Sequence, residues 1–279
     1  MSDIAQPAAK RRFRPLAGDP RHWPGVGFMA ALFFGYVYLP IFILIALSFN
    51  KNELVTIWTG FSFDWYLKAV QNEAVLRAAW NSLLIATIAS LCATALATLA
   101  AVRMARDRFA GQIAVNAMVA LPLTVPEIVT AVSTLMFFSV VGITQGLTTV
   151  ILAHTVFCIP FAYLPIRARL DGLDPKLAEA AGDLYANPRQ AFRMITLPLM
   201  MPGIMSGAVL AFIISLDDFV TTFFVGGAGS TTLPVYIFGL IRVGVSPEVN
   251  AISSIMLMVS IALVSISLLL GRGHERSQR

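Results

Sequence analysis

Six long apolar runs, separated by shorter polar segments, dominate the chain. A helix needs about 20 apolar residues to cross a hydrocarbon layer of about 30 Å, because each residue rises about 1.5 Å. The runs that reach this length cover residues 27–49, 78–102, 112–141, 147–166, 197–216 and 250–270. The pattern therefore predicts an all-α membrane protein with six transmembrane helices.

The run at 112–141 differs from the others because it contains LPLTVPEIV, with Pro122 and Pro126. Each proline removes a backbone donor and disfavours helix for the residue before it. A break inside a span is tolerated only where it is buried in protein or lines a cavity. Glu127 follows the break, and an ionisable residue within a span is a functional candidate by default. The alternative is a structural role as partner of a hydroxyl or amide at the break.

Charge adds an orientation to this picture. The chain is 57% hydrophobic and 13% charged, against about 25% charged in a typical soluble domain. Sixteen of the 20 Lys and Arg residues fall in the N-terminal tail, the second and fourth segments between spans, and the C-terminal tail. The positive-inside rule therefore predicts cytoplasmic N and C termini. The net charge of +5 reflects this topology, and no nucleic-acid partner is needed to explain it.

One domain is expected: a cytoplasmic tail at 1–26, a transmembrane domain at 27–270 with a cytoplasmic loop at about 167–196, and a cytoplasmic tail at 271–279. Many polar and basic residues precede the first full-length span, so that span is expected to be retained rather than cleaved as a signal peptide. Cys92 and Cys158 fall inside predicted spans. Neither a disulfide nor a metal site is predicted.

The polar segment between the fourth and fifth spans predicts two short helices. Asp174 and Pro175 form a cap and first-turn pair, so one helix should begin there. Its apolar face contains Leu177, Ala181 and Leu184, and its charged stripe contains Lys176, Glu179 and Asp183. A second start follows at Asn187, because Gln190 three residues later matches a capping box. The segment is expected to lie at the membrane surface.

From residue 179 the chain reads EAAGDLYANPRQAFRMITLP. This stretch resembles the signature of the inner-membrane permease subunits of bacterial ABC importers, which is EAA, three residues, Gly, nine residues and Ile-x-Leu-Pro. The matching positions are Glu179, Ala180, Ala181, Ile195, Leu197 and Pro198. The glycine position holds Tyr185, where a left-handed conformation would cost about 1–2 kcal/mol. The resemblance fixes the register of the loop and leaves the geometry of this turn open.

Further strings resemble the second permease of polyamine importers, of the putrescine and spermidine type. They are SFN at 48–50, LVTIWTGFS at 54–62, AHTVFCIPFAY at 153–163, SLDDFV at 215–220 and TTLPVYIFGLIRVGVSPEVNA at 231–251. Permeases for other small solutes share the EAA loop, so a different cargo is the alternative.

The resemblance implies a type I ABC importer permease in the bacterial inner membrane, which forms half of the translocation pathway. Its implied partners are a homologous second permease, two copies of an ATPase subunit, a periplasmic polyamine-binding protein and membrane lipid. ATP and Mg²⁺ would be bound by the ATPase, since this chain has no GxxxxGK[ST] phosphate loop. The chain itself is expected to be a transporter subunit, not an enzyme, with no cofactor. Coupling to the ATPase is expected at Glu179, Ala180, Ala181, Leu184 and Tyr185; the alternative is an amphipathic helix that rests on lipid.

A polyamine is a flexible cation, so its path would need carboxylates and aromatic faces. The candidates are Glu127, Asp217, Asp218, Phe219 and Tyr236. The alternatives are solvated acids at a helix end and ordinary aromatic packing. His154, in the fourth span, is expected to form interhelical hydrogen bonds rather than a proton relay.

Two other classes fit six spans less well. An intramembrane serine protease would use Ser206 and His154 as a dyad, but their order along the chain and the GIMSG context differ from the rhomboid-like arrangement. A stand-alone secondary transporter should show internal repeats and no capping-box loop in the EAA register.

Overall fold

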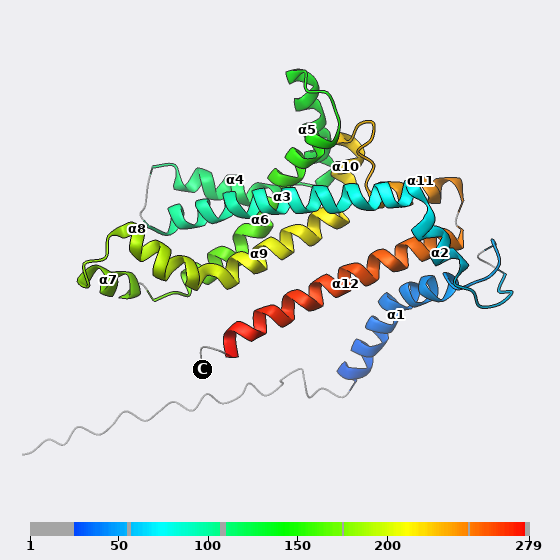
Figure 1. Cartoon of the computed structure of the whole chain (residues 1–279), viewed down its shortest axis with the longest axis horizontal. Coiled ribbons are helices and arrows are strands. Elements are labelled where there is room, and N and C mark those ends of the chain that lie inside the picture. The colour runs from blue at the N-terminus through cyan, green and yellow to red at the C-terminus, as the bar shows by residue number, and fades with distance from the viewer. Residues whose placement is uncertain (1–24, 55–56, 107–109, 175, 245, 277–279) are drawn as a thin grey trace, which may run out of the picture.

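The computed structural model describes residues 25–54, 57–106, 110–174, 176–244 and 246–276, and these residues are almost entirely helical. The helices are α1 (Val26–Leu47), α2 (Asp64–Gln71), α3 (Glu73–Arg106), α4 (Gln112–Thr124), α5 (Glu127–Val141), α6 (Leu147–Asp171), α7 (Lys176–Asp183), α8 (Pro188–Ala191), the π-helical turn η2 (Phe192–Thr196), α9 (Leu197–Asp217), α10 (Val220–Val225), α11 (Leu233–Val243) and α12 (Pro247–Arg276). Figure 1 shows the long helices side by side, with α5 rising away from them.

Within the described residues, five of the six predicted spans are confirmed as helices of sufficient length and apolarity, and the sixth is present as a bent pair of shorter helices. Five spans are unbroken helical runs: α1, α3, α6, the run Pro188–Asp217 and α12. The sixth is the pair α4 and α5. The fifth span begins earlier than predicted, because η2 continues the helix from α8 into α9 without a break.

The predicted break in the third span is also confirmed, and Pro126 causes it. Val125 is extended with ψ 134°, and α4 and α5 meet at a bend of 113°. This is the backbone that a residue before proline prefers. Pro122, which was expected to contribute to the break, instead lies inside α4, where the helix continues to Thr124. One proline therefore sets the direction of α5.

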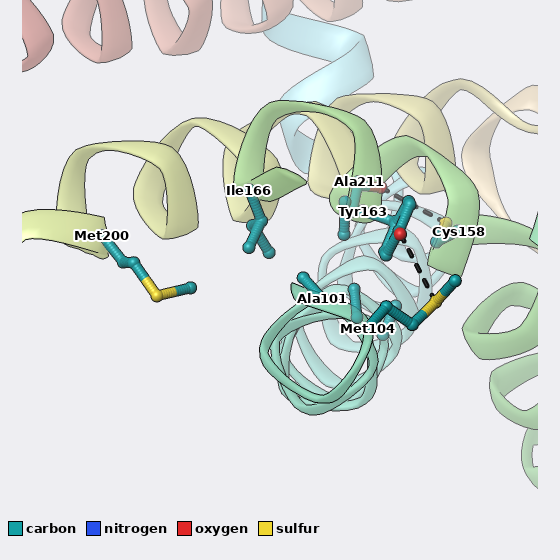
Figure 2. Close-up of a cluster of buried hydrophobic side chains, with 10 residues drawn as sticks. Ala101, Met104, Cys158, Tyr163, Ile166, Met200 and Ala211 are labelled. Atoms are coloured by element: carbon teal, nitrogen blue, oxygen red, sulfur yellow. Dashed lines mark hydrogen bonds between the residues drawn. The ribbon is translucent and has the colours of Figure 1, made fainter. Parts of the chain in front are cut away.

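The core lies where α3, α6 and α9 pack together, and most of its side chains are small. The buried cluster comprises Ala93, Ala97, Ala101, Met104, Cys158, Ala162, Tyr163, Ile166, Met200 and Ala211 (Figure 2). Small residues let transmembrane helices approach closely, so that dispersion contacts between their backbones hold them together. Tyr163 Oη lies 3.5 Å from Met104 Sδ and adds a polar contact between α6 and α3.

Two glycines bring α9 directly against α6. A Cβ at Gly207 would lie 2.6 Å from the carbonyl oxygen of Ala162, and a Cβ at Gly203 would lie 2.6 Å from Cβ of Arg169. The Arg169 guanidinium also donates through Nε to the Leu199 carbonyl oxygen at 2.9 Å. The two spans that flank the EAA loop therefore form one tightly packed pair.

Candidate translocation site and EAA loop

The site begins at the junction between α9 and α10, where two adjacent aspartates differ in exposure. Asp217 ends α9 and is exposed. Asp218 leaves the helix with an extended backbone, ψ 125°, and its side chain is only 1% exposed. Its Oδ1 accepts a hydrogen bond from the Thr221 backbone N–H at 3.0 Å. The helix end thus turns one carboxylate into the protein and leaves the other outside.

His154 of α6 is buried against this junction. Its Nδ1 lies 2.8 Å from Ser215 Oγ, and its Nε2 lies 2.9 Å from Thr222 Oγ1. The same Nε2 lies 3.1 Å from Asp218 Oδ2. The imidazole therefore connects α6, α9 and α10, which confirms the expected interhelical role. Asp218 Oδ2 accepts no well-aligned hydrogen bond within the described part of the chain, so its contact with His154 is chiefly electrostatic.

Glu127 joins these residues from the third span. It is the first residue of α5, directly after Pro126, and its side chain is exposed at the break. Its carboxyl group interacts electrostatically with Asp218 and His154. The bend in the third span therefore brings Glu127 to the α9–α10 junction. We call Glu127, His154, Ser215, Asp218 and Thr222 the pathway cluster.

The two aromatic candidates, Phe219 and Tyr236, lie in different parts of the structure. Phe219 follows Asp218 and packs against Phe223 and Phe238, with ring centroids 5.3 and 4.6 Å apart. Tyr236 on α11 instead packs against the small core formed with α2, α3 and α12, and its hydroxyl accepts from Asn72 Nδ2 at 3.5 Å. Of the aromatic candidates, Phe219 is therefore the one adjacent to a buried carboxylate.

Sequence reasoning missed Ser215 and Thr222 as members of the site. No helical stripe links them, because α9 ends at Asp217, Asp218 is extended and Thr222 lies on α10. The available signal was only that hydroxyl residues flank Asp218 within a few positions of an otherwise apolar stretch.

The cluster has a simple electrostatic property. Two carboxylates from different spans lie next to each other, and like charges at short range repel more strongly in protein than in bulk water. A cation placed between them removes that repulsion and gains attraction from both. The arrangement therefore suits a positively charged ligand.

The EAA loop, residues 167–196, contains the two predicted short helices. The carboxylate of Asp174 accepts from the Lys176 backbone N–H at 3.0 Å, at the start of α7, while Pro175 lies outside the described residues. The predicted capping box is present, because Asn187 Oδ1 accepts from the Gln190 N–H at 2.9 Å and Gln190 Oε1 accepts from the Asn187 N–H at 3.0 Å. Local capping therefore determines where each helix begins.

The predicted coupling residues divide into a buried and an exposed group. Ala181 is buried at 5% exposure, whereas Ala180 is exposed. Leu184 and Tyr185 are 81% and 96% exposed. Leu184, at the end of the predicted apolar face, therefore does not pack against the rest of the described chain. Glu179 lies in α7, but its side chain lies outside the described part of the structure.

The turn between α7 and α8 adopts the backbone that the glycine in the family signature would favour. Tyr185 has φ 62°, and it is the only non-glycine residue with positive φ in the described ranges. Its N–H donates to the Gly182 carbonyl at 2.9 Å, and the next N–H, of Ala186, donates to the Ala181 carbonyl at 3.0 Å. The turn keeps its left-handed geometry and accepts the strain of a side chain.

A pocket of about 490 Å³ lies between this loop and the spans. Apolar side chains from α3, α6, α7, η2 and α9 line most of it, including Val102, Leu170, Leu177, Phe192, Ile195 and Leu199. Leu177 thus faces the body of the protein, whereas Leu184 and Tyr185 extend from the loop. The protein supports the loop from one side only.

The Ser206–His154 dyad of the disfavoured protease alternative is not formed. Ser206 is exposed on α9, and the serine that contacts the His154 ring is Ser215. The imidazole nitrogens are occupied by two hydroxyls and a carboxylate at the α9–α10 junction.

Solved structures of ABC transporters share this fold. A bacterial ABC transporter involved in the import of the acidic polysaccharide alginate aligns with a TM-score of 0.68 over 88% of this chain and 93% of its own, at 18% identity. The MetNI methionine ABC transporter in an inward-facing conformation aligns with a TM-score of 0.60 over 71% of this chain and 94% of its own, at 22% identity. The fold is that of a type I ABC importer permease.

Sequence comparison gives the family. Residues 93–279 match the profile of the binding-protein-dependent transport system inner membrane component, and the chain belongs to this family. The spermidine/putrescine transport system permease protein PotC of Haemophilus influenzae is 44% identical over 87% of this chain and 94% of its own. The putrescine transport system permease protein PotI of Escherichia coli K12 is 41% identical over 80% of this chain and 82% of its own. The chain is a multi-pass permease subunit of the bacterial inner membrane.

Proposed function

We propose that this permease subunit forms half of the pathway of an ATP-driven polyamine importer. The observation that carries the proposal is the pathway cluster, in which the carboxyl groups of Glu127 and Asp218 meet beside His154 at a bend between spans. Two relatives that are more than 40% identical to this chain are named as putrescine or spermidine permeases. Identity at this level over most of the chain supports the same class of cargo.

The chemistry of a polyamine matches this cluster. Putrescine and spermidine carry ammonium groups separated by flexible methylene chains, so each ammonium needs a carboxylate or an aromatic face when it leaves water. Glu127 is exposed and can meet an arriving ammonium first, whereas Asp218 is buried and can hold it deeper. The ring of Phe219 lies next to Asp218 in the chain and offers a face for the methylene segment.

The proposed assembly contains the partners that such a cargo requires. A homologous second permease completes the pathway, and a periplasmic polyamine-binding protein delivers the substrate. Two copies of an ATPase subunit bind ATP and Mg²⁺ and contact the EAA loop, with both termini of this chain on the same cytoplasmic side. The exposed Leu184 and Tyr185 support this contact, because they offer apolar surface that the chain itself does not cover.

A permease for a different small solute is the second candidate, since importers of several cargoes share this fold. The test is uptake of labelled putrescine, spermidine and an uncharged solute into proteoliposomes that contain the whole complex. Glu127→Gln should slow uptake of both polyamines about tenfold, because one of two interacting charges is lost. ATP hydrolysis should remain stimulated by the binding protein. Wild-type uptake by the variant would remove Glu127 from the path, and failure of the intact complex to accumulate either amine would refute the cargo.

A further inference from the structure

Asp218 poses a problem of solvation that its surroundings only partly solve. Its side chain is 1% exposed, and a buried carboxylate is costly unless nearby groups compensate for lost water. Oδ1 accepts from the Thr221 N–H, but Oδ2 accepts no well-aligned hydrogen bond among the described residues. The 3.1 Å contact with His154 Nε2 is therefore an important interaction of that oxygen in the absence of substrate.

The His154 ring is held at both nitrogens. Ser215 Oγ lies 2.8 Å from Nδ1, and Thr222 Oγ1 lies 2.9 Å from Nε2. A hydroxyl can either donate or accept, so Ser215 Oγ can donate to Nδ1 while Nε2 carries the hydrogen that faces Thr222 Oγ1 and Asp218 Oδ2, and only this tautomer attracts the carboxylate. Because Ser215 lies on α9 and Thr222 on α10, the ring also fixes the junction at which Asp218 leaves the helix.

We propose that His154 is a positioning residue that holds the Asp218 carboxylate toward Glu127, so that the two carboxylates act as one site for a substrate ammonium. This inference rests on the proposed function. His154 does not itself contact the substrate: its Nε2 holds Oδ2 in place while the path is empty. An arriving ammonium then supplies the donor that Oδ2 lacks.

Two polar replacements of His154 test whether the donor near Asp218 is needed. In His154→Gln the side-chain amide can reach the position of Nε2 and keep a donor near Asp218 and Thr222. In His154→Asn the shorter amide reaches only the position of Nδ1 and keeps the contact with Ser215. Asparagine is also one methylene smaller than glutamine, so packing loss would act in the same direction, and a double-mutant cycle with Asp218→Asn is needed to separate the two effects.

The test is the concentration dependence of labelled spermidine and putrescine uptake by the complete complex in proteoliposomes. His154→Asn should raise KM about tenfold with little change in maximal rate, because a contact to the charged Asp218 carboxylate is lost. His154→Gln should stay within about threefold of wild type. Thr155→Val is the matched control, since the Thr155 hydroxyl donates to the Ile151 carbonyl of its own helix.

A double-mutant cycle with Asp218→Asn decides whether His154 acts through Asp218. If it does, adding His154→Asn to Asp218→Asn should change KM less than about twofold, since coupled residues give non-additive effects. Additive effects, equal KM values for the Asn and Gln variants, or an effect confined to maximal rate would each overturn the proposal.

The result for wild type separates this inference from the proposed function. Uptake of neither amine by the intact complex would mean that the cargo was assigned wrongly. In that case the same cycle is measured on the thermal unfolding midpoint of the purified complex. Non-additive shifts would support the His154–Asp218 coupling, and additive shifts would overturn it.

Discussion

The pathway cluster and the EAA loop use polar and apolar side chains in opposite ways. In the pathway cluster, polar groups from α5, α6, α9 and α10 are gathered around a buried aspartate and contact one another. In the EAA loop, large apolar side chains at Leu184 and Tyr185 are left in the open, while the polar groups serve as helix caps. The pathway cluster thus places polar side chains in an apolar interior, whereas the EAA loop places apolar side chains on an exposed surface.

The difference indicates where each region finds its interaction partner. A buried polar cluster is costly unless its groups are satisfied or take up a ligand, so its contacts are made within this chain. The apolar side chains of the exposed turn are not buried by this chain, so they would be stabilised by burial against another surface. Changes in the pathway cluster should therefore affect substrate handling, and changes at the turn should affect coupling.

The largest effect is expected when both carboxylates are neutralised. Glu127→Gln combined with Asp218→Asn should reduce polyamine uptake about a hundredfold, since two charge-assisted contacts of about 1.5 kcal/mol each are lost. The complex should still assemble, because Asn at 218 can accept from the Thr221 N–H as Asp does. Uptake and pull-down of partner subunits measure the two quantities. Asp64→Asn, an exposed acid on α2, is the control, and a loss of assembly in the double variant would contradict the division of roles.

The next effect is expected at the exposed turn. Leu184→Asp should lower the ATP hydrolysis that depends on substrate-loaded binding protein about tenfold, because an apolar contact at an interface is replaced by a charge. KM for uptake and the unfolding midpoint of the permease pair should not change, because Leu184 is 81% exposed in this chain. Leu184→Met is the matched control. A raised KM with normal coupling would assign the turn to substrate handling instead.

The smallest effect concerns the backbone of Tyr185. Tyr185→Gly should stabilise the permease by about 1 kcal/mol, because glycine adopts φ 62° without the steric cost of a Cβ. Tyr185→Ala keeps that cost and removes only the ring, so it should not stabilise the chain. Thermal unfolding of both variants measures the difference. An equal rise for alanine would show that the ring, and not the backbone, causes the strain.

Much of this fold could be predicted from sequence because its signals are local. Apolar runs set the spans, Pro126 set the bend, and Asn187 with Gln190 set the start of α8. Pro122 was read wrongly, since proline only weakens a helix whose last turn is otherwise supported. Capping and proline signals therefore predicted where helices begin better than they predicted whether a helix continues through a proline.

The candidate site could be predicted only in part, because its members meet through tertiary packing. Glu127 and Asp218 were both proposed as isolated acids, but nothing in the chain indicated that they would interact with each other. Tyr236 and Phe219 could not be separated, since aromatic residues pack and bind with the same faces. Only the placement of α10 and α11 assigned Tyr236 to a separate core.

The close approach of α9 to α6 at Gly203 and Gly207 has a mechanical consequence. One end of this helix pair carries the EAA loop, and the other carries His154 and Ser215, about 26 Å away along α6 at 1.5 Å per residue. With so little space between the backbones, the pair can tilt as a stiff lever but cannot easily slide. A tilt of about 5° over that length moves the far end by about 2 Å. His154 and Asp218 would move together with the pair, so a push on the loop would reach the carboxylate as a change in its separation from Glu127 on α5.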